Sequence, residues 1–339
     1  MAKVNVTPRV VSGMRPSGKL HFGHLNGVLK NWLKLQEEYD CNFFVADWHA
    51  LTTGYADLKD LEENVIEMVV DWLSVGVDPE KSVVFVQSAV KEHAELFVLL
   101  SMITPLPWLE RNPTYKEQLD EIKSKDIRTF GFLGYPVLQT ADIIIYKATK
   151  VPVGIDQAPH VELAREITRR FNHLYGEVFP EPETLLTETP KILGTDGRKM
   201  SKSYGNSVYI SDTPEEIEKK ILPMVTDTAR QRKTDPGNPE VCPLYISFHK
   251  LYSDSETLKW VEDGCTKATI GCVECKKSVI PKVIESLAPI RERRIELLKD
   301  KDTVRDILKA GNARASATAR ETMEKVREVM GLNDFNGSR

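Results

Sequence analysis

The stretch RVVSGMRPSGKLHFGHLNG, residues 9–27, contains the transition that decides the fold. Residues 9–14 are a short apolar run typical of a strand, and RPSG, residues 15–18, is a turn. From Phe22 onward, apolar side chains recur with helical spacing at positions 25, 28, 29, 32 and 35. A strand, a turn and a helix in succession are the repeating unit of an α/β fold.

The rest of the first half repeats this alternation. Buried strands are predicted at 42–46, 82–86 and 151–154, and a helix near 61–73 is followed by Gly76, which is placed to end it. Alternating strands and helices predict a doubly wound parallel sheet. Ligands of such sheets bind beyond the carboxyl ends of the strands.

The second half shows no convincing strand pattern after about residue 208. A helix is predicted to begin near Asp212 or Thr213, because Glu216 completes a capping signal. A last long helix carries an apolar stripe that ends before Gly331: Ala315, Ala319, Met323, Val326 and Met330. We therefore expect two domains, an α/β domain at 1–207 and an all-helical domain at 208–339.

Composition limits the class of protein. The chain has 339 residues, of which 41% are hydrophobic and 28% charged, as in ordinary globular proteins. No apolar run is long enough to span a bilayer, and the start lacks the apolar core of a signal peptide, so we expect a cytoplasmic protein without membrane contact. The net charge of −4 argues against a wholly basic nucleic-acid coat protein. Local basic clusters at 230–233, 276–277 and 291–294 leave room for a nucleic-acid partner, although each is equally compatible with a solvated face.

HFGH, residues 21–24, stands where the first turn gives way to a helix. A helix N-terminus attracts anions through its free amide groups and its dipole. His21 and His24 are three apart, so they share a face and can donate to phosphate oxygens, while Gly23 allows a ligand to approach the backbone. The alternative is a helix start with two surface histidines.

KMSKS, residues 199–203, follows Gly197, which allows the loop to move. Lys199 and Lys202 supply compact positive charge, and Ser201 and Ser203 supply hydroxyl donors. Such a loop can stabilise negative charge that develops on a leaving pyrophosphate. By itself it could also be a solvated loop.

Together, the two motifs resemble the catalytic pair of class I aminoacyl-tRNA synthetases. In that family the first motif holds ATP and the second stabilises the pentavalent phosphate during adenylation, which implies catalytic roles for His21, His24, Lys199 and Lys202. Small-substrate nucleotidyltransferases share the HxGH pattern but lack KMSKS. A non-enzymatic RNA-binding protein with an inactivated synthetase fold is the remaining alternative.

The resemblance extends over essentially the whole chain to the bacterial-type tryptophanyl-tRNA synthetases, through the segments at 12–27, 45–53, 135–146, 151–172 and 193–203. It implies a Rossmann-like catalytic domain followed by a helical anticodon-binding domain. It also implies activation of L-tryptophan by ATP with Mg²⁺, transfer to tRNA-Trp, and a homodimer.

The resemblance implies a tryptophan pocket. Asp142 matches the carboxylate that accepts the indole N–H, and Tyr135 and Gln139 share its helix face at i−7 and i−3. The other matching positions are two edge residues, two that pack the ring and one that holds the ammonium or carboxylate end of the substrate: Gly13, His49, Val151, Val153 and Gln157. Taken alone, Asp142 could be a helix-surface carboxylate.

The same match implies an ATP site, in which Asp156 takes the ribose hydroxyls. Its members are Arg15, Pro16, Ser17, Gly23, His24, Gly154, Ile155, Asp156, Ile192, Lys199, Met200, Ser201, Lys202 and Ser203. Ile155 departs from the glutamate common in the family, so its side chain cannot accept a hydrogen bond.

The segment at 135–142 also fits the tyrosine-specific sister enzymes, which add a tyrosine on the first strand to hold the phenol. This chain has Val11 in that area, and valine supplies no hydroxyl. The tyrosine enzymes remain the alternative.

The cysteines form a separate signature. Cys242, Cys265, Cys272 and Cys275 give the spacing C-x22-C-x6-C-x2-C, whereas Cys41 adjoins a buried strand and is expected in the core. Four thiols so close together suit structural zinc or an iron–sulfur cluster, and spacing alone does not choose between them. Free thiols without metal are the third reading. A subset of tryptophanyl-tRNA synthetases holds a [4Fe–4S] cluster at this spacing in the anticodon-binding domain, so the resemblance favours the cluster.

Overall fold

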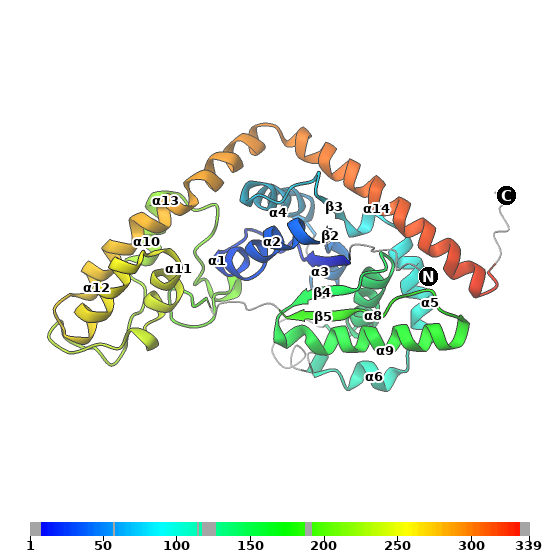
Figure 1. Cartoon of the computed structure of the whole chain (residues 1–339), viewed down its shortest axis with the longest axis horizontal. Helices are drawn as coiled ribbons and strands as arrows, with labels where there is room; N and C mark the ends of the chain where they lie inside the picture. Colours follow the sequence, from blue (N-terminus) through cyan, green and yellow to red (C-terminus); the bar gives the residue numbers. More distant parts are fainter. Residues whose placement is uncertain (1–7, 57, 114, 117–126, 187–191, 333–339) are drawn as a thin grey trace.

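The computed structural model describes residues 8–56, 58–113, 115–116, 127–186 and 192–332. Figure 1 shows an α/β part and a helical part at opposite ends of an elongated molecule, connected along one side by two long helices, α13 (Cys272–Lys299) and α14 (Lys301–Val329).

The sheet has five parallel strands in the order β3-β2-β1-β4-β5. Their bounds are β1 Arg9–Met14, β2 Asp40–Val45, β3 Ser82–Val86, β4 Lys150–Val153 and β5 Glu183–Leu186. The four predicted strands are confirmed. Sequence reasoning missed the edge strand β5, which is only half-buried and carries no strong apolar signal. Because the chain runs outward from β1 to β3 and then returns beside β1 as β4, the strand order reverses between β1 and β4.

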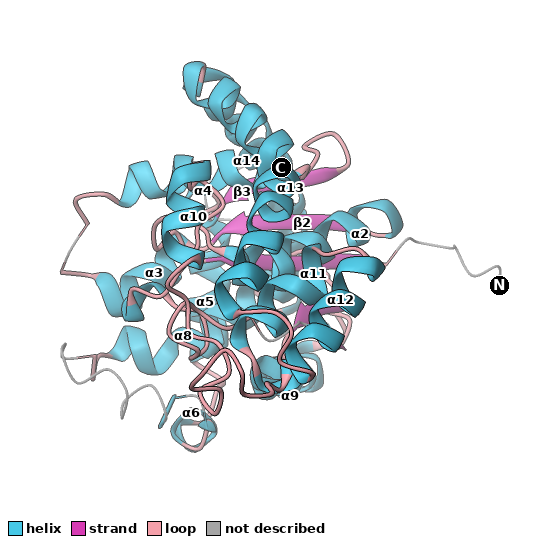
Figure 2. Cartoon of the chain, turned by 90° about the vertical axis from the view of Figure 1, so that its left-hand side faces the viewer, coloured by secondary structure: helices cyan, strands magenta, loops and turns pink. Residues whose placement is uncertain are grey.

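Helices cover both faces of the sheet (Figure 2). In the α/β part they are α1 Phe22–His24, the π-helical turn η1 Leu25–Leu29, α2 Lys30–Glu38, α3 Asp47–Gly54, α4 Leu61–Val75, η2 Gln87–Ala89, α5 Glu92–Ser101, α6 Leu106–Glu110, α8 Phe130–Ile144, η3 Ile155–Gln157, α9 Ala158–Tyr175 and η4 Lys202–Tyr204. The helix predicted near 61–73 is confirmed. It ends at Gly76, whose φ of 119° is a left-handed conformation that glycine adopts readily.

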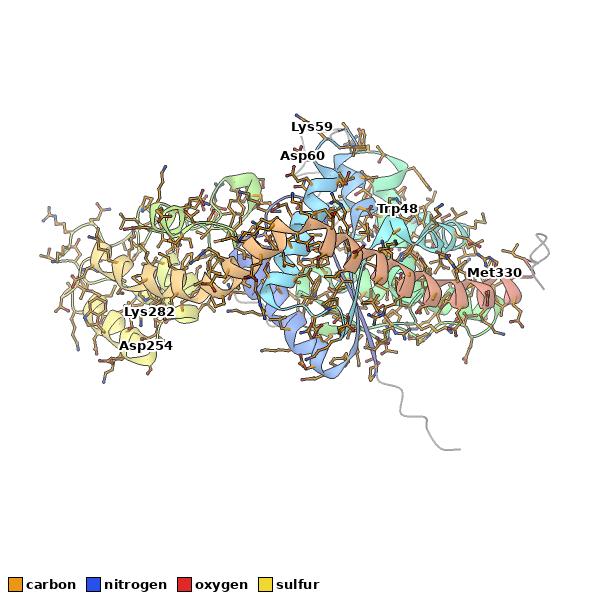
Figure 3. All side chains as sticks on the ribbon, turned by 90° about the horizontal axis from the view of Figure 1, so that it is seen from above. Trp48, Lys59, Asp60, Asp254, Lys282 and Met330 are labelled. Atoms are coloured by element: carbon orange, nitrogen blue, oxygen red, sulfur yellow. The ribbon has the colours of Figure 1, made fainter. Side chains whose placement is uncertain are left out.

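The described residues after 208 form helices joined by loops, and none of them belongs to a strand of the sheet, as predicted. Its remaining elements are α10 Pro214–Ile221, η5 Pro239–Val241, η6 Tyr245–His249, α11 Lys250–Tyr252 and α12 Ser255–Thr266. Thr213 caps α10 in a capping box with Glu216. Figure 3 shows Lys282 of α13 beside Asp254, the residue that caps α12, and the two side chains form an ion pair.

The apolar stripe of α14 packs on the sheet rather than on the helical part. Ala315, Ala319 and Met323 are buried in the same core cluster as Val11 of β1. A Cβ atom on Gly311 would lie 1.8 Å from the carbonyl oxygen of Val84, so only glycine permits this approach of α14 to β3. Residues 301–329, which the expected division at 207/208 assigns to the helical domain, therefore pack on the α/β part. The stripe predicts a buried face, but it does not identify the partner.

Helix α13 is anchored to the α/β part by an ion pair. The Arg294 Nε donates to Asp71 Oδ1 of α4 at 2.8 Å, and its guanidinium also contacts Glu67. The Arg294 side chain is only 12% exposed. The basic cluster at 291–294 therefore contributes at least this cation to internal packing.

Candidate functional site

A cavity of about 380 Å³ lies at the carboxyl ends of β1 and β4, where the strand order reverses. Each residue predicted to surround tryptophan lines it: Gly13, His49, Tyr135, Gln139, Asp142, Val151, Val153 and Gln157. Their assigned roles stay predictions. The segment at 9–27, which runs from β1 through the turn into α1, brings Gly13, Arg15 and His24 to the same cavity.

Asp142 is fully buried, and the protein itself supplies its hydrogen-bond donors. His49 Nε2 lies 2.7 Å from Oδ2, while His93 Nδ1 lies 2.6 Å from Oδ1. Gln87 Nε2 contacts both oxygens, at 2.8 and 3.0 Å. Burial raises the pKa of Asp142, but His49 and His93, which lie against its two oxygens, outweigh this effect and hold the pKa below its ordinary value. Asp142 is therefore an ionised acceptor, not a surface carboxylate.

Sequence reasoning missed Gln87 and His93. Gln87 begins η2 directly after β3, and His93 lies in the first turn of α5; neither falls within a recognised motif. The position of Gln87 after the carboxyl end of a parallel strand is the one signal that could have identified it. Also missed was His160, whose Nε2 is 2.9 Å from the Tyr135 hydroxyl. Burial raises the pKa of Tyr135 to about 12, which keeps this hydroxyl protonated.

The two histidines of HFGH form the N-terminal cap of α1. His21 Nδ1 accepts from the Gly23 N–H at 3.1 Å, and His24 Nδ1 accepts from the His21 N–H at 3.1 Å. Because each Nδ1 is an acceptor, each neutral ring carries its proton on Nε2 and can donate it. Burial, with the nearby Lys202 charge, lowers the pKa of His21 to about 4, and burial lowers that of His24 to about 2.

Gly23 is required by the protein itself. A Cβ atom there would lie 2.8 Å from Cε1 of His21. The absence of a side chain at position 23 is expected to let a ligand approach the backbone. It also leaves space for the His21 ring.

The KMSKS loop meets the turn after β1. The Lys202 Nζ donates to the carbonyl oxygen of Gly18 at 2.8 Å and to the Ser17 hydroxyl at 3.2 Å. Burial lowers the pKa of Lys202 to about 8. Ser201 and Ser203 share a hydroxyl contact of 2.8 Å, and the Lys199 side chain is exposed.

Asn206, three residues after KMSKS, organises this loop. It is buried, and its Oδ1 accepts from the Ser201 N–H at 2.8 Å. Its Nδ2 donates to Asp196 at 2.7 Å and to the Lys199 carbonyl oxygen. Asn206 therefore links residues of the loop to Asp196, which precedes it.

The other predicted ATP residues lie in the turn after β1, after β4 and at the KMSKS loop. Pro16 and Ser17 belong to the turn after β1, and Gly154 and Ile155 follow β4, with Ile155 79% exposed. The carbonyl oxygen of Ile192 accepts from the Met200 N–H at 3.0 Å, and both side chains are buried. The side chain of Asp156 lies outside the described residues.

The four clustered cysteines line one small cavity of the helical part: Cys242, Cys265, Cys272 and Cys275. Arg230 Nη1 lies 3.8 Å from the sulfur of Cys265 and 3.9 Å from that of Cys272. Among the described residues, no group of three or more His, Cys, Asp or Glu side chains is placed so that it could hold a metal ion. Four thiols are suitable ligands for a soft metal centre. As described, however, their side chains are not placed so that they could hold one. Cys41 is buried in the core of the sheet, as expected.

Two of the basic clusters turn side chains inward. Lys276 is buried and donates to the carbonyl oxygen of Leu222 at 2.8 Å. Arg230 donates to the carbonyl oxygen of Ile270 at 2.7 Å. No helix in the described part of the chain is both long and apolar enough to cross a membrane.

The chain is similar to known proteins along nearly its whole length. Residues 3–288 match the family model described as tRNA synthetases class I (W and Y). The tryptophan–tRNA ligase of Thermotoga maritima is 56% identical over 326 residues, covering 96% of this chain and 99% of the relative. That of Aquifex aeolicus is 49% identical over 394 residues, covering 96% of this chain and all of the relative.

Solved structures agree with these relatives. The tryptophanyl-tRNA synthetase of Campylobacter jejuni, in complex with ADP and tryptophan, superposes with a TM-score of 0.87 at 36% identity and covers 96% of this chain and all of its own. The tyrosyl-tRNA synthetase of Aeropyrum pernix reaches 0.65 at 22% identity, covering 91% of this chain and 90% of its own, which shows a shared fold alone.

Proposed function

The chain belongs to the class I tRNA synthetases that serve tryptophan and tyrosine, and we propose that its cavity binds L-tryptophan beside ATP. It acts as a tryptophan–tRNA ligase, which activates L-tryptophan with ATP and transfers it to the 3′ end of tRNA-Trp. The observation that carries the site assignment is that the predicted tryptophan residues surround one cavity, with the ionised Asp142 among them.

In the proposed site, Asp142 accepts the indole N–H, while Val151 and Val153 pack the ring. Gln157 meets the ammonium or carboxylate end of the substrate at the mouth of the cavity. The carboxylate of tryptophan attacks the α-phosphate of ATP, so no side-chain nucleophile is needed. Catalysis then consists of alignment and stabilisation of charge.

The ATP phosphates lie between the two motifs. Neutral His21 and His24 donate hydrogen bonds from their Nε2–H groups to phosphate oxygens. The Lys202 ammonium stabilises the pyrophosphate as its bond to the α-phosphate breaks. Lys199 on the exposed side of the loop adds a second cation. Mg²⁺ accompanies ATP and neutralises phosphate charge when bound.

Tyrosine is the second candidate substrate. The helix face at 135–142 is compatible with a phenol, but Val11 lines the cavity on β1 and presents no hydroxyl partner. Asp142 can accept the hydrogen bond that either substrate donates. Identity to the tryptophan enzymes, at 40–56% in the relatives compared, favours tryptophan.

The helical part is the proposed anticodon-binding region, and its four cysteines are the proposed ligands of a [4Fe–4S] cluster, with structural zinc as the alternative. The shared cavity of these cysteines supports a common centre, and the Arg230 guanidinium lies beside two of the sulfurs. Such a centre ties distant segments of a helical domain together and takes no part in adenylation. The cytoplasm stays the predicted compartment.

A homodimer is also proposed. Large apolar side chains are exposed on α5, α8 and the turn between α5 and α6: Val98, Phe130 and Met102. Such side chains on neighbouring elements suit a second copy of the chain. Sedimentation should give a dimer for the wild type and a monomer for Phe130→Glu, whereas Leu174→Glu on α9 should leave the dimer intact. A wild-type monomer at assay concentration would contradict this proposal.

Charging tests the proposed function directly. The purified chain should attach tryptophan to a tRNA-Trp transcript and should leave a tRNA-Tyr transcript uncharged with either amino acid. Tyrosine attached to tRNA-Tyr, with no product from tryptophan, would identify the sister activity instead.

A further inference from the structure

The two oxygens of Asp142 have different surroundings. Oδ1 receives His93 Nδ1 at 2.6 Å and Gln87 Nε2 at 2.8 Å, and both donors are fully buried behind the cavity. Oδ2 receives His49 Nε2 at 2.7 Å, and His49 lines the cavity. Oδ1 is thus held from the interior of the protein alone, whereas Oδ2, which Gln87 Nε2 also contacts at 3.0 Å, meets His49 at the wall of the cavity.

The protonation of His93 follows from its partners. An ionised carboxylate only accepts, so His93 Nδ1 must donate to Asp142. Its Nε2, 2.7 Å from the Tyr146 hydroxyl, is then free to accept the hydroxyl proton. The rings of Phe44 and Phe85 lie 6.3 and 6.1 Å from the His93 ring, so apolar side chains adjoin this chain of donors.

The orientation of Gln87 is fixed in the same way. Its Oε1 accepts from the Trp48 N–H at 3.1 Å, which leaves the amide NH₂ to face Asp142. Turning the amide over would place its oxygen against a carboxylate and its NH₂ against an N–H donor. Both buried contacts would then be lost.

We propose that His93 and Gln87 are positioning residues for substrate selection. They hold Asp142 as a pure hydrogen-bond acceptor with Oδ2 toward the cavity, so that the site selects an aromatic amino acid whose ring carries an N–H. This inference rests on the proposed binding of tryptophan at Asp142 and adds the residues that make Asp142 selective.

Selection follows from the geometry of the carboxylate. While His93 and Gln87 hold Oδ1, the carboxylate cannot rotate away from the cavity or take up a proton and become a donor. A ring without an N–H then leaves a buried, ionised acceptor short of a partner, and such a deficit is worth about ten- to a hundredfold in kcat/KM. Without the hydrogen bonds from His93 and Gln87, the carboxylate can rotate toward the interior of the protein. The loss of kcat/KM for a ring without an N–H then becomes smaller.

The test compares L-tryptophan with β-(3-benzothienyl)-L-alanine, which has the same shape and a sulfur atom in place of the N–H. The ratio of kcat/KM values in ATP–pyrophosphate exchange measures selection for the N–H. We expect the wild type to prefer tryptophan by at least about tenfold and His93→Leu to lose most of that preference. His93→Asn should restore it, because the asparagine NH₂ can take the place of the imidazole Nδ1–H.

Thr140→Val is the matched control, since Thr140 is buried on the same helix as Asp142 and its hydroxyl donates only to the Pro136 carbonyl oxygen. It should keep the wild-type ratio. If His93→Leu fails to fold, as judged by circular dichroism, Gln87→Met tests the same claim with a side chain of similar length.

The outcomes separate this inference from the proposed function. A ratio that stays at the wild-type value in His93→Leu and Gln87→Met, with both substrates slowed equally, would overturn the positioning role while leaving tryptophan activation intact. A wild-type chain without tryptophan-dependent exchange would instead overturn the proposed function. The inference is supported if His93→Leu loses the preference for tryptophan and His93→Asn restores it.

Discussion

The Lys202 ammonium lies 2.8 Å from the carbonyl oxygen of Gly18, a residue 184 positions earlier in the chain. This contact joins the KMSKS loop to the turn that precedes HFGH, and these are the two motifs proposed to bind the ATP phosphates. When ATP enters, Lys202 can exchange a carbonyl oxygen for a phosphate oxygen with little movement of the loop.

Lys202→Ala should lower kcat for adenylation by about a hundred- to a thousandfold, with a much smaller change in the KM for ATP. The reason is that charge accumulates on the pyrophosphate only as the bond breaks, so Lys202 acts mainly on the transition state. Steady-state pyrophosphate exchange measures both constants. A raised KM with a normal kcat would show that the loop serves only to bind ATP.

The pH dependence should also report on Lys202. In the free enzyme its pKa is lowered by burial from 10.5 to about 8, so the amine loses its charge as the pH rises through that value. We expect kcat/KM for ATP to fall above this pH by about tenfold per unit, because this ratio reflects ionisation of the free enzyme. Lys202→Arg should remove the decline, since arginine stays charged. A profile that is flat up to pH 10 would contradict the assignment.

Asp142→Ala should reduce discrimination between tryptophan and phenylalanine as well as the rate. The indole N–H then enters a buried site without its acceptor, at a cost of about 1–3 kcal/mol. Because His49 and His93 also lose their acceptor, the folded state should be weakened too, and a thermal melt must accompany the kinetics. Unchanged discrimination in a folded variant would remove Asp142 from the substrate site.

Arg294→Met should destabilise the chain by about 3–5 kcal/mol, because it leaves the carboxylate of Asp71 buried without its cation. Burial raises the pKa of Asp71 even with Arg294 present, so part of the loss should be recovered below the folded-state pKa, where Asp71 is protonated. Denaturant unfolding at two pH values measures both effects. Arg305→Met, which breaks an exposed pair with Asp302, is the control and should cost less than about 1 kcal/mol.

Cys272→Ser should weaken tRNA charging more than tryptophan-dependent exchange. Cys272 lines the cysteine cavity of the helical part, whereas the adenylation cavity lies in the α/β part. The anaerobically purified wild type should contain about four irons and four sulfides per chain. A colourless wild type with one zinc would favour the alternative centre. Equal loss of both activities in a folded variant would argue against an anticodon role.

Strands β1 to β4, the capped helices and the cavity beyond the strand ends could be predicted, because each depends on local patterns or on motifs that lie at the ends of strands. Gln87 and His93 could not, because their role arises only when η2 and α5 pack against Asp142 on α8. The stripe on α14 likewise predicts a buried face but cannot identify its partner, since apolar spacing is the same against a sheet or a helix. The basic clusters show the same limit of a sequence pattern. Charge in the sequence does not reveal that Lys276 and Arg294 find partners inside the protein.

The most direct test of the account is ATP–pyrophosphate exchange by the purified chain with each of the twenty amino acids in turn. The cavity at the junction of β1 and β4, with Asp142 held as an acceptor, predicts exchange that depends on tryptophan and is at least about a hundredfold weaker with tyrosine or phenylalanine. Exchange that depends on tyrosine, or none with any amino acid, would contradict it.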